Sequence, residues 1–358
     1  MRLYGIGTLR RWTRRVWLAT QSRAVILLYH RVAELSSDPQ LLSVTPQHFA
    51  EHLEHICEYY HPMSLIELCR SLAAKHVPHR AVVITFDDGY ADNLWNAKPL
   101  LERYDVPATI FVTTGHVGQN REFWWDELER LLFLPERLPE TLTLNIDGEL
   151  YEWSLRENEE QRTWKYEYSD TALPAPSSML RWDVTMEICP SPRYKVYKEL
   201  HHLLRPLDDK ERKRVLTALS RWAGLSRDGR PAYRVLNHSE LKALGDCSLI
   251  EIGSHSITHP VLSTQPLELQ SREIVESKRF LEDILGYPVN SFSYPYGGTG
   301  EVSEETVRLI REAGYEMACA NFSALVTGRS SPYWLPRYLV RDWGGEEFAH
   351  RLRRLFRG

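Results

Sequence analysis

One repeated pattern constrains the fold of this chain more than any other feature. A short apolar run is followed by a polar turn and then by an amphipathic helical pattern, and near the N-terminus the runs are AVILLY, AVVITF and ATIFVT, at Ala24–Tyr29, Ala81–Phe86 and residues 108–113. Uninterrupted apolar runs of this length are typical of strands buried on both faces, and their alternation with helices predicts parallel strands. The expected fold class is therefore α/β, as an open sheet or as a (β/α) barrel.

The alternation stops after about residue 118 and resumes at His238. Between these points the sequence predicts a helix from Trp124, a hairpin turning at Asp147-Gly148, a loop rich in Pro and Ser at 173–178, and two helices near 194–204 and 208–222. After His238 it predicts strands at 249–253, 291–294, 315–320 and 338–340, with helices at 266–285 and 304–313. The predicted domains are a barrel (24–118 and 238–345), an insertion or lid (119–237), and basic terminal segments (1–23 and 346–358).

Composition excludes several classes of protein. The 358 residues contain 44 Lys and Arg against 48 Asp and Glu, a net charge of −4, so binding of nucleic acid by bulk charge is excluded. No stretch approaches 18 apolar residues, which argues against a membrane-spanning helix. The five cysteines are widely spaced without a CxxC pair, which argues against a disulfide framework. Arginines interrupt the N-terminus before any long apolar core, so we expect no signal peptide and a cytoplasmic location.

Reactive side chains follow four of the predicted strands, at the point where each strand ends. They are His30, the pair Asp87-Asp88, the pair His255 and His259, and Pro295-Tyr296. In parallel α/β proteins, ligands bind beyond the carboxyl ends of the strands. The sequence therefore predicts that these residues form one site.

The spacing His255-Ser-Ile-Thr-His259 lets two imidazoles converge on one metal ion if these residues form a turn. Asp88 is the nearest plausible third ligand, and two His with one carboxylate leave positions open for water and substrate, as in catalytic zinc sites. Its neighbour Asp87 then remains free to act as a general base. The alternative for Asp87-Asp88-Gly89 is an Asx turn in which the glycine supplies a positive φ.

Thr85-Phe-Asp-Asp-Gly89 together with His255-Ser-Ile-Thr-His259 resembles the polysaccharide deacetylase family, also known as the NodB-homology domain or carbohydrate esterase family 4. The similarity covers about residues 24–118 and 238–342. It implies a distorted (β/α)7-type barrel, here with a large mixed α/β insertion, and metal-dependent removal of N-acetyl groups from a sugar, polysaccharide or glycolipid precursor. It also implies that one divalent ion, expected to be Zn2+ with Co2+, Ni2+ or Mn2+ as alternatives, is held by Asp88, His255 and His259, with Asp87 as the base.

The resemblance implies further roles. The Tyr296 backbone N–H would help to hold the oxyanion, and Pro295 would lie beside it against the substrate. Many family members have an Arg that pairs with the base where this chain has Ser293, so we take Arg337 as its replacement, with a purely structural ion pair as the alternative. Leu28-Tyr-His30 resembles members in which the catalytic-acid strand has moved to the N-terminus, which makes His30 the expected general acid, with a core histidine as the alternative.

Substrate and partners are less constrained. Trp125 is expected to stack on a sugar ring, with core packing as the alternative. Rival functions are a carbohydrate O-deacetylase, another acyl-amide hydrolase, or a non-catalytic carbohydrate-binding derivative. The expected partner is an N-acetylated glycan. The basic termini also allow peripheral contact with an anionic membrane or a lipid-linked glycan, against the alternative of a solvated helix or frayed terminus.

Overall fold

The computed structural model describes residues 23–156 and 182–357, and its centre is a parallel β-sheet. The strands pair in the order β11-β10-β9-β6-β5-β1-β12, and β4 pairs with β5 on the side of this path. Every pairing between these strands is parallel, as the alternation predicted. The strands are β1 (Ala24–Tyr29), β4 (His61–Pro62), β5 (Ala81–Phe86), β6 (Ala108–Val112), β9 (Ile250–Ser254), β10 (Ser291–Ser293), β11 (Met317–Cys319) and β12 (Tyr338–Leu339).

The path of seven strands curves until its two edges meet at an irregular seam. Ala320 N donates to Leu335 O at 2.8 Å and Leu335 N donates to Ala318 O at 3.0 Å, just before the chain enters β12 and pairs with β1. The segment 335–339 thus contacts both edges of the sheet, β11 through Leu335 and β1 through β12. This is a distorted (β/α) barrel, and the fold class predicted from the sequence is confirmed.

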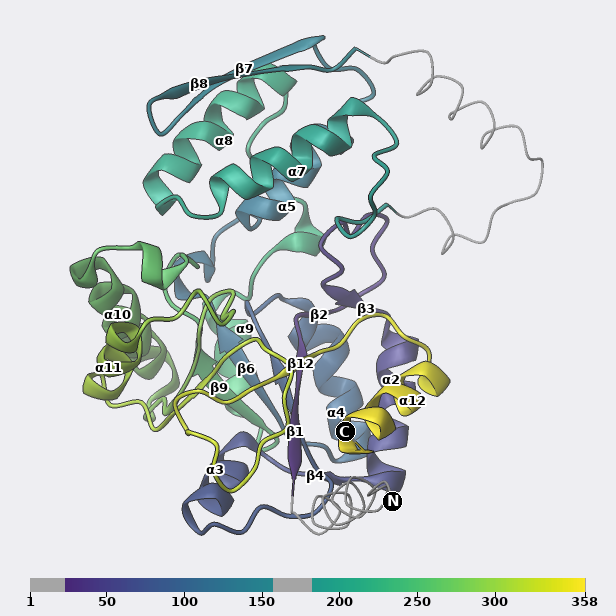
Figure 1. Cartoon of the computed structure of the whole chain (residues 1–358), viewed down its shortest axis with the longest axis vertical. Coiled ribbons are helices and arrows are strands. Elements are labelled where there is room, and N and C mark those ends of the chain that lie inside the picture. Colours follow the sequence, from purple (N-terminus) through teal and green to yellow (C-terminus); the bar gives the residue numbers. More distant parts are fainter. Residues whose placement is uncertain (1–22, 157–181, 358) are drawn as a thin grey trace, which may run out of the picture.

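Helices cover the outside of this sheet (Figure 1). They are α2 (Pro46–Tyr59), α3 (Leu65–Ala73), α4 (Lys98–Tyr104), α9 (His238–Gly245), α10 (Leu267–Leu285), α11 (Glu304–Glu312) and α12 (Gly345–Arg357). Because the helices shield the outer face and side chains fill the inside, all residues of β1 and β5 are buried. That burial explains why these strands are apolar throughout.

The helix that the sequence pattern predicts after the apolar run Ala81–Phe86 (β5) is divided in two. A π-helical turn, η1 (Asn93–Ala97), comes first and α4 follows. Pro99 has no N–H to donate to Trp95 O, so a regular α-helical ladder cannot run through this point. The predicted helix therefore exists with a wider turn at its start.

A second group of elements stands above the barrel in Figure 1. It contains α5 (Trp124–Phe133), the hairpin of β7 (Thr141–Ile146) and β8 (Glu149–Ser154), α7 (Pro192–Leu204) and α8 (Asp209–Ala223). We call these elements the insertion lobe. Helix α5 packs against α7 and α8, and β7 packs against α8. The hairpin turn lies at Asp147 and Gly148 as predicted, with φ of 50° and 86°, while the predicted loop at 173–178 lies outside the described residues.

Two smaller features complete the fold. The short strands β2 (Arg31–Val32) and β3 (Ser43–Val44) pair beside the end of β1, and 3-10 turns occur at η2 (Thr114–His116), η3 (Pro231–Tyr233) and η4 (Leu262–Thr264). The predicted C-terminal tail is largely the helix α12, which packs on α2 with Phe348 and Leu352 buried. Across residues 23–156 and 182–357, no helix is long and apolar enough to cross a membrane.

Candidate active site

The predicted site residues meet at a cavity of about 300 Å³ beyond the carboxyl ends of β1, β5 and β9. Its wall includes seven of the nine residues singled out from the sequence: His30, Asp87, Asp88, Trp125, His255, His259 and Tyr296. Arg337 lies behind Asp87, and Pro295 is not part of the wall. The barrel and the insertion lobe both contribute to this cavity.

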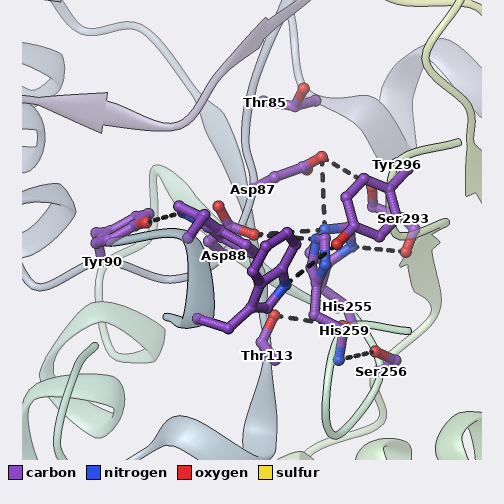
Figure 2. Close-up of polar contacts among 12 residues, drawn as sticks. Thr85, Asp87, Asp88, Tyr90, Thr113, His255, Ser256, His259, Ser293 and Tyr296 are labelled. Carbon is purple, nitrogen blue, oxygen red and sulfur yellow. Dashed lines mark hydrogen bonds and ion pairs between the residues drawn. The ribbon is translucent and has the colours of Figure 1, made fainter. Parts of the chain in front are cut away.

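Asp88, His255 and His259 form a buried three-residue cluster on the cavity floor (Figure 2). Asp88 Oδ1 lies 3.6 Å from His255 Nε2 and 3.4 Å from His259 Nε2. One ligand atom from each residue lies within 4.8 Å of the others. These distances bring the three side chains close enough to share one ion.

The protonation states suit a divalent cation. Burial lowers the pKa of both histidines, so each imidazole keeps a free nitrogen lone pair. His255 Nδ1 lies 2.7 Å from Ser293 O, so Nδ1 carries the hydrogen and Nε2 faces Asp88 as a potential ligand. Burial and the neighbouring Asp87 raise the pKa of Asp88, and its Oδ1 has no hydrogen-bond partner in the described part of the chain. A buried oxygen without a donor beside two neutral imidazoles fits a bound metal ion.

The loop 255–259 is held from both sides by side chains distant in sequence. Glu273 on α10 accepts hydrogen bonds from Ile257 N at 2.7 Å and from Thr258 N at 2.8 Å. Arg212 on α8 donates to the carbonyl oxygens of Thr258 and His259, both at 3.3 Å. A carboxylate therefore satisfies the amides of this loop, and a guanidinium from the insertion lobe satisfies its carbonyls.

Left-handed backbone conformations gather at the site. Asp88, Ser256, His259 and Tyr296 have φ of 76°, 64°, 56° and 62°. Non-glycine residues rarely adopt these angles, and they persist where the surrounding structure holds them. Gly89 also has a positive φ of 76°, and an added Cβ would lie 3.1 Å from Val112 Cγ1. Gly89 thus has the positive φ expected for a turn, and the Asp87 carboxylate binds Arg337 and Ser293. The two carboxylates on this turn line the cavity.

Asp87 is bound by a buried arginine. Arg337 Nη1 and Nη2 each donate to one carboxylate oxygen of Asp87 at 2.7 Å, and Ser293 Oγ donates to Asp87 Oδ2 at 3.1 Å. Burial alone would raise the pKa of Asp87, but Arg337 and His255 outweigh it and lower the pKa to about 2. Arg337 therefore occupies the position expected of the missing family arginine, and Asp87 is ionised at neutral pH.

His30 lies at the end of β1 and its side chain faces the cavity. Its Nδ1 is buried and has no hydrogen-bond partner among the described residues. Burial lowers the pKa of His30 to about 3, against a smaller opposite effect of Asp87. The side chain is therefore neutral at rest, whereas a general acid has to carry a proton before it can donate one.

Aromatic side chains form the wall next to His259. Trp125 stacks on Phe123 at a centroid distance of 4.6 Å and lies edge-on to His259 at 4.9 Å. The Tyr296 ring meets His259 from another direction at 4.6 Å, and Trp124 Nε1 donates to Tyr296 OH at 3.2 Å. Trp125 is only 5% exposed, so it is mainly a packing residue with one edge on the cavity.

Sequence reasoning missed four residues that shape the site. Glu273 and Arg212 hold the histidine loop, and Arg205 and Arg341 line the cavity mouth. No short motif contains them, because each lies on a different element from the residues that it supports. Only tertiary packing brings them to the site.

The protein is thus a distorted (β/α) barrel with paired aspartates and two histidines at the carboxyl ends of its strands. The model of the family described as "Polysaccharide deacetylase" matches residues 74–133 and 203–318. The chain therefore carries a polysaccharide deacetylase domain, and the resemblance stated from its motifs is confirmed.

Solved structures agree on the fold. The deacetylase PplD of Streptococcus pyogenes in complex with acetate has a TM-score of 0.55 and 16% identity, with 93% of this chain and 99% of PplD covered. IcaB of Ammonifex degensii has a TM-score of 0.55 and 15% identity, with 93% and 97% covered. At this level of identity the likeness concerns the fold alone.

Curated relatives match over shorter stretches. YxkH of Bacillus subtilis is 29% identical over 119 residues, which are 32% of this chain and 41% of that protein. The poly-beta-1,6-N-acetyl-D-glucosamine N-deacetylase of Staphylococcus aureus strain MSSA476 is 49% identical over 43 residues, 12% of this chain and 15% of that protein. The chain thus spans less than half the length of these curated relatives.

Proposed function

We propose that this protein is a metal-dependent hydrolase that removes N-acetyl groups from an N-acetylated sugar, polysaccharide or glycolipid precursor and releases acetate. The observation that carries the proposal is the buried Asp88–His255–His259 cluster next to an aspartate held ionised by Arg337. The family match and the N-deacetylase named among the relatives support an acetamide as the bond that is cleaved.

In this proposal Asp88, His255 and His259 hold one divalent ion, and two imidazoles with one carboxylate favour Zn2+, with Co2+, Ni2+ or Mn2+ able to fill the same donor set. When bound, such an ion would polarise the acetyl carbonyl and acidify a water molecule. The remaining steps belong to side chains and backbone groups of the chain itself.

Asp87 is the proposed general base. Its pKa of about 2 keeps it ionised across the working range, so it can take a proton from the attacking water. Arg337 acts through Asp87: its two hydrogen bonds fix the carboxylate plane and keep it charged. Arg337 is therefore a positioning residue rather than a group that contacts substrate.

Tyr296 and His30 complete the proposed mechanism. The Tyr296 N–H donates to no described residue, and its left-handed φ of 62° belongs to a tight turn closed by Gly297 N and Pro295 O at 2.7 Å. We propose that this N–H stabilises the developing oxyanion. His30 is the proposed proton donor to the leaving amine; because burial lowers its pKa to about 3, it has to take up a proton during the reaction before it can donate one.

We further propose a cytoplasmic location. All five cysteines are free in the structure, which supports a reducing compartment. Contact with an anionic membrane or a lipid-linked glycan stays a prediction, because residues 1–22 lie outside the described residues.

The test is acetate release from a panel of N-acetylglucosamine oligosaccharides and from O-acetylated sugars, with the purified chain before and after chelation. We expect acetate from the N-acetylated oligosaccharides, loss of release on chelation, and recovery with Zn2+. Asp87→Asn should abolish turnover and still bind one metal ion per chain. Release from O-acetylated sugars alone would replace the proposal with an O-deacetylase, and the absence of both metal and turnover would favour a carbohydrate-binding role.

A further inference from the structure

The mouth of the cavity differs in charge from its floor. The carboxylates that line the cavity are Asp87 and Asp88, both on the floor. Besides the residues predicted from the sequence, the cavity is lined by Gln40, Leu42, His201, Arg205, Asn321, Leu339 and Arg341, which are partly exposed and which we call its mouth; they include two arginines and no acidic side chain. A substrate in the cavity therefore lies near two guanidinium groups.

Arg341 lies on the His30 side of the mouth, just after β12. Its Nη1 donates to the carbonyl oxygens of Gln40, at 3.0 Å, and Leu41. In the described part of the chain no carboxylate forms an ion pair with it, and the carboxylates that act on it, Asp38 and Asp183, do so without contact. Burial lowers the pKa of Arg341, which shows that its charge is poorly compensated.

Arg205 lies at the end of α7, next to Tyr296. Its guanidinium stacks over the Tyr296 ring at 4.3 Å from the centroid, and Nη2 forms an ion pair with Glu301 Oε1. Its Nε is buried and lacks a hydrogen-bond partner among the described residues. One donor of this side chain is thus unsatisfied next to the tyrosine whose backbone is proposed to hold the oxyanion.

We propose that these two arginines bind anionic groups next to the reacting sugar, so that the preferred substrate is an N-acetylated glycan whose neighbouring sugars or linkages carry a carboxylate or a phosphate. The proposal rests on the proposed function for the identity of the central sugar. A neutral glycan would leave Arg341 without a carboxylate or phosphate in direct contact. Arginine binds carboxylate and phosphate groups in the same planar, charge-assisted geometry, so both sources share one chemistry.

The experiment measures binding by calorimetry to the full-length chain and to Asp87→Asn, which removes turnover as a complication. Three tetrasaccharides are compared: neutral N-acetylglucosamine, N-acetylglucosamine alternating with glucuronate, and N-acetylglucosamine carrying phosphate esters. We expect at least one anionic ligand to bind about tenfold more tightly than the neutral one. That advantage should shrink as the salt concentration rises, and the tighter anion identifies the chemical source.

Variants separate the rim arginines from general charge effects. Arg205→Gln and Arg341→Gln should each remove most of the advantage and leave neutral binding unchanged within about twofold, while Arg205→Lys should retain part of it. Lys195→Gln is the matched control, because it removes one positive charge from the same helix α7 at a side chain that is 73% exposed. If Arg341→Gln fails to fold, Arg205→Gln alone tests whether the mouth arginines cause the anionic preference.

Two results would overturn the inference: equal affinity for neutral and anionic ligands, or an anionic preference that survives in Arg205→Gln. These outcomes are independent of the proposed function. Preferential anion binding without acetate release from any ligand would contradict the hydrolase and leave the arginine site standing. Acetate release from all ligands, with equal affinity for neutral and anionic ones, would support the hydrolase and contradict the arginine site.

Discussion

At the scale of single residues, the two adjacent aspartates show how the environment assigns different roles to identical side chains. Arg337 lowers the pKa of Asp87, whereas burial and Asp87 itself raise the pKa of Asp88. Neighbouring carboxylates whose pKa values diverge in this way can divide the work between a base and a ligand. The division depends on a single arginine that is 250 residues from Asp87 in sequence.

Arg337→Gln should therefore leave Asp87 protonated over more of the pH range and its carboxylate less firmly positioned. Without the guanidinium, burial raises the pKa of Asp87, so the acid limb of kcat/KM should move to higher pH and kcat should fall about a hundredfold or more. Removing one partner of a buried ion pair should also lower the free energy of unfolding by about 3 kcal/mol. The pH–rate profile and chemical denaturation measure these effects.

Arg337→Lys serves as the comparison because it keeps the charge and loses the paired geometry. It should retain the acid limb near its original pH with reduced kcat. An unchanged pH profile in Arg337→Gln would contradict the role assigned to this pair.

Asp126 provides a pH-dependent term in stability. It accepts a hydrogen bond from Tyr90 OH at 2.7 Å, and burial raises its pKa to about 7. Because the folded-state pKa exceeds the unfolded value of about 3.9, its contribution is fully present below pH 4 and is lost as the pH rises through 7. Asp126→Asn keeps the acceptor for Tyr90 and removes the titration.

The free energy of unfolding of Asp126→Asn should therefore equal that of the wild type near pH 4 and exceed it by about 2 kcal/mol at pH 8. This figure is smaller than the full value that the pKa shift implies, because the side chain is partly exposed. Denaturant unfolding at both pH values measures this. A constant difference between the two proteins across this range would show that Asp126 does not titrate as stated.

The motif residues could be predicted from the sequence because each follows a strand whose apolar run is unmistakable. Arg337 could be predicted because Ser293 stands where an arginine is expected, which directed the search to another arginine. His30 was placed correctly at the cavity, but its low pKa could not be predicted, since burial is a property of the packed structure. Arg205, Arg212 and Arg341 carry no local signal at all.

At the scale of elements, the strained loop 255–259 depends on its neighbours for its shape. Ser256 and His259 both have a left-handed backbone, and Glu273 from α10 binds the amides between them. The strand and helix boundaries around this loop were predicted to within about two residues, because apolar runs and caps define them. The contact with α10 was not predictable, because no periodicity indicates which helix side chain meets which loop.

Glu273→Gln should loosen this loop, because the neutral amide oxygen of Gln accepts hydrogen bonds from Ile257 N and Thr258 N more weakly than the charged carboxylate oxygen that accepts both of them. Metal affinity should fall about tenfold or more, in the range found when groups that orient metal ligands are lost. A competition assay with a chromogenic chelator measures it without reference to activity. The control is Glu276→Gln on the same helix, because the Glu276 side chain is 52% exposed. Equal metal affinities in the two variants would contradict the role of Glu273 in holding the loop.

At the scale of the whole molecule, the α/β class followed from the alternation of strands and helices and the barrel from the family resemblance, whereas neither predicted the arrangement of the insertion lobe. The hairpin and the two later helices of the lobe were predicted as separate elements. Trp125 was expected at the substrate site, but the contributions of His201 and Arg205 to the cavity were not, because no motif marks them in the sequence. Long-range packing decided this part of the fold.

The predicted membrane contact also belongs to this scale. We expect the full-length chain to sediment with vesicles containing anionic phospholipid and the chain lacking residues 1–23 to remain in the supernatant, because the segment adds arginines next to apolar residues. Neutral vesicles are the control. Sedimentation of both chains would place the membrane contact outside residues 1–23. Sedimentation of neither would contradict a membrane contact.

The cavity has a floor built by the barrel and a mouth built partly by the insertion lobe. Under the proposed function, the residues that would cleave the bond thus lie on the barrel, and the lobe adds some of the residues that would contact the substrate. Replacement of the lobe by that of a relative would be a route to new substrates that leaves the catalytic floor in place, provided that an arginine equivalent to Arg212 still reaches the histidine loop. Evolution could diversify such an enzyme by altering the insertion lobe alone.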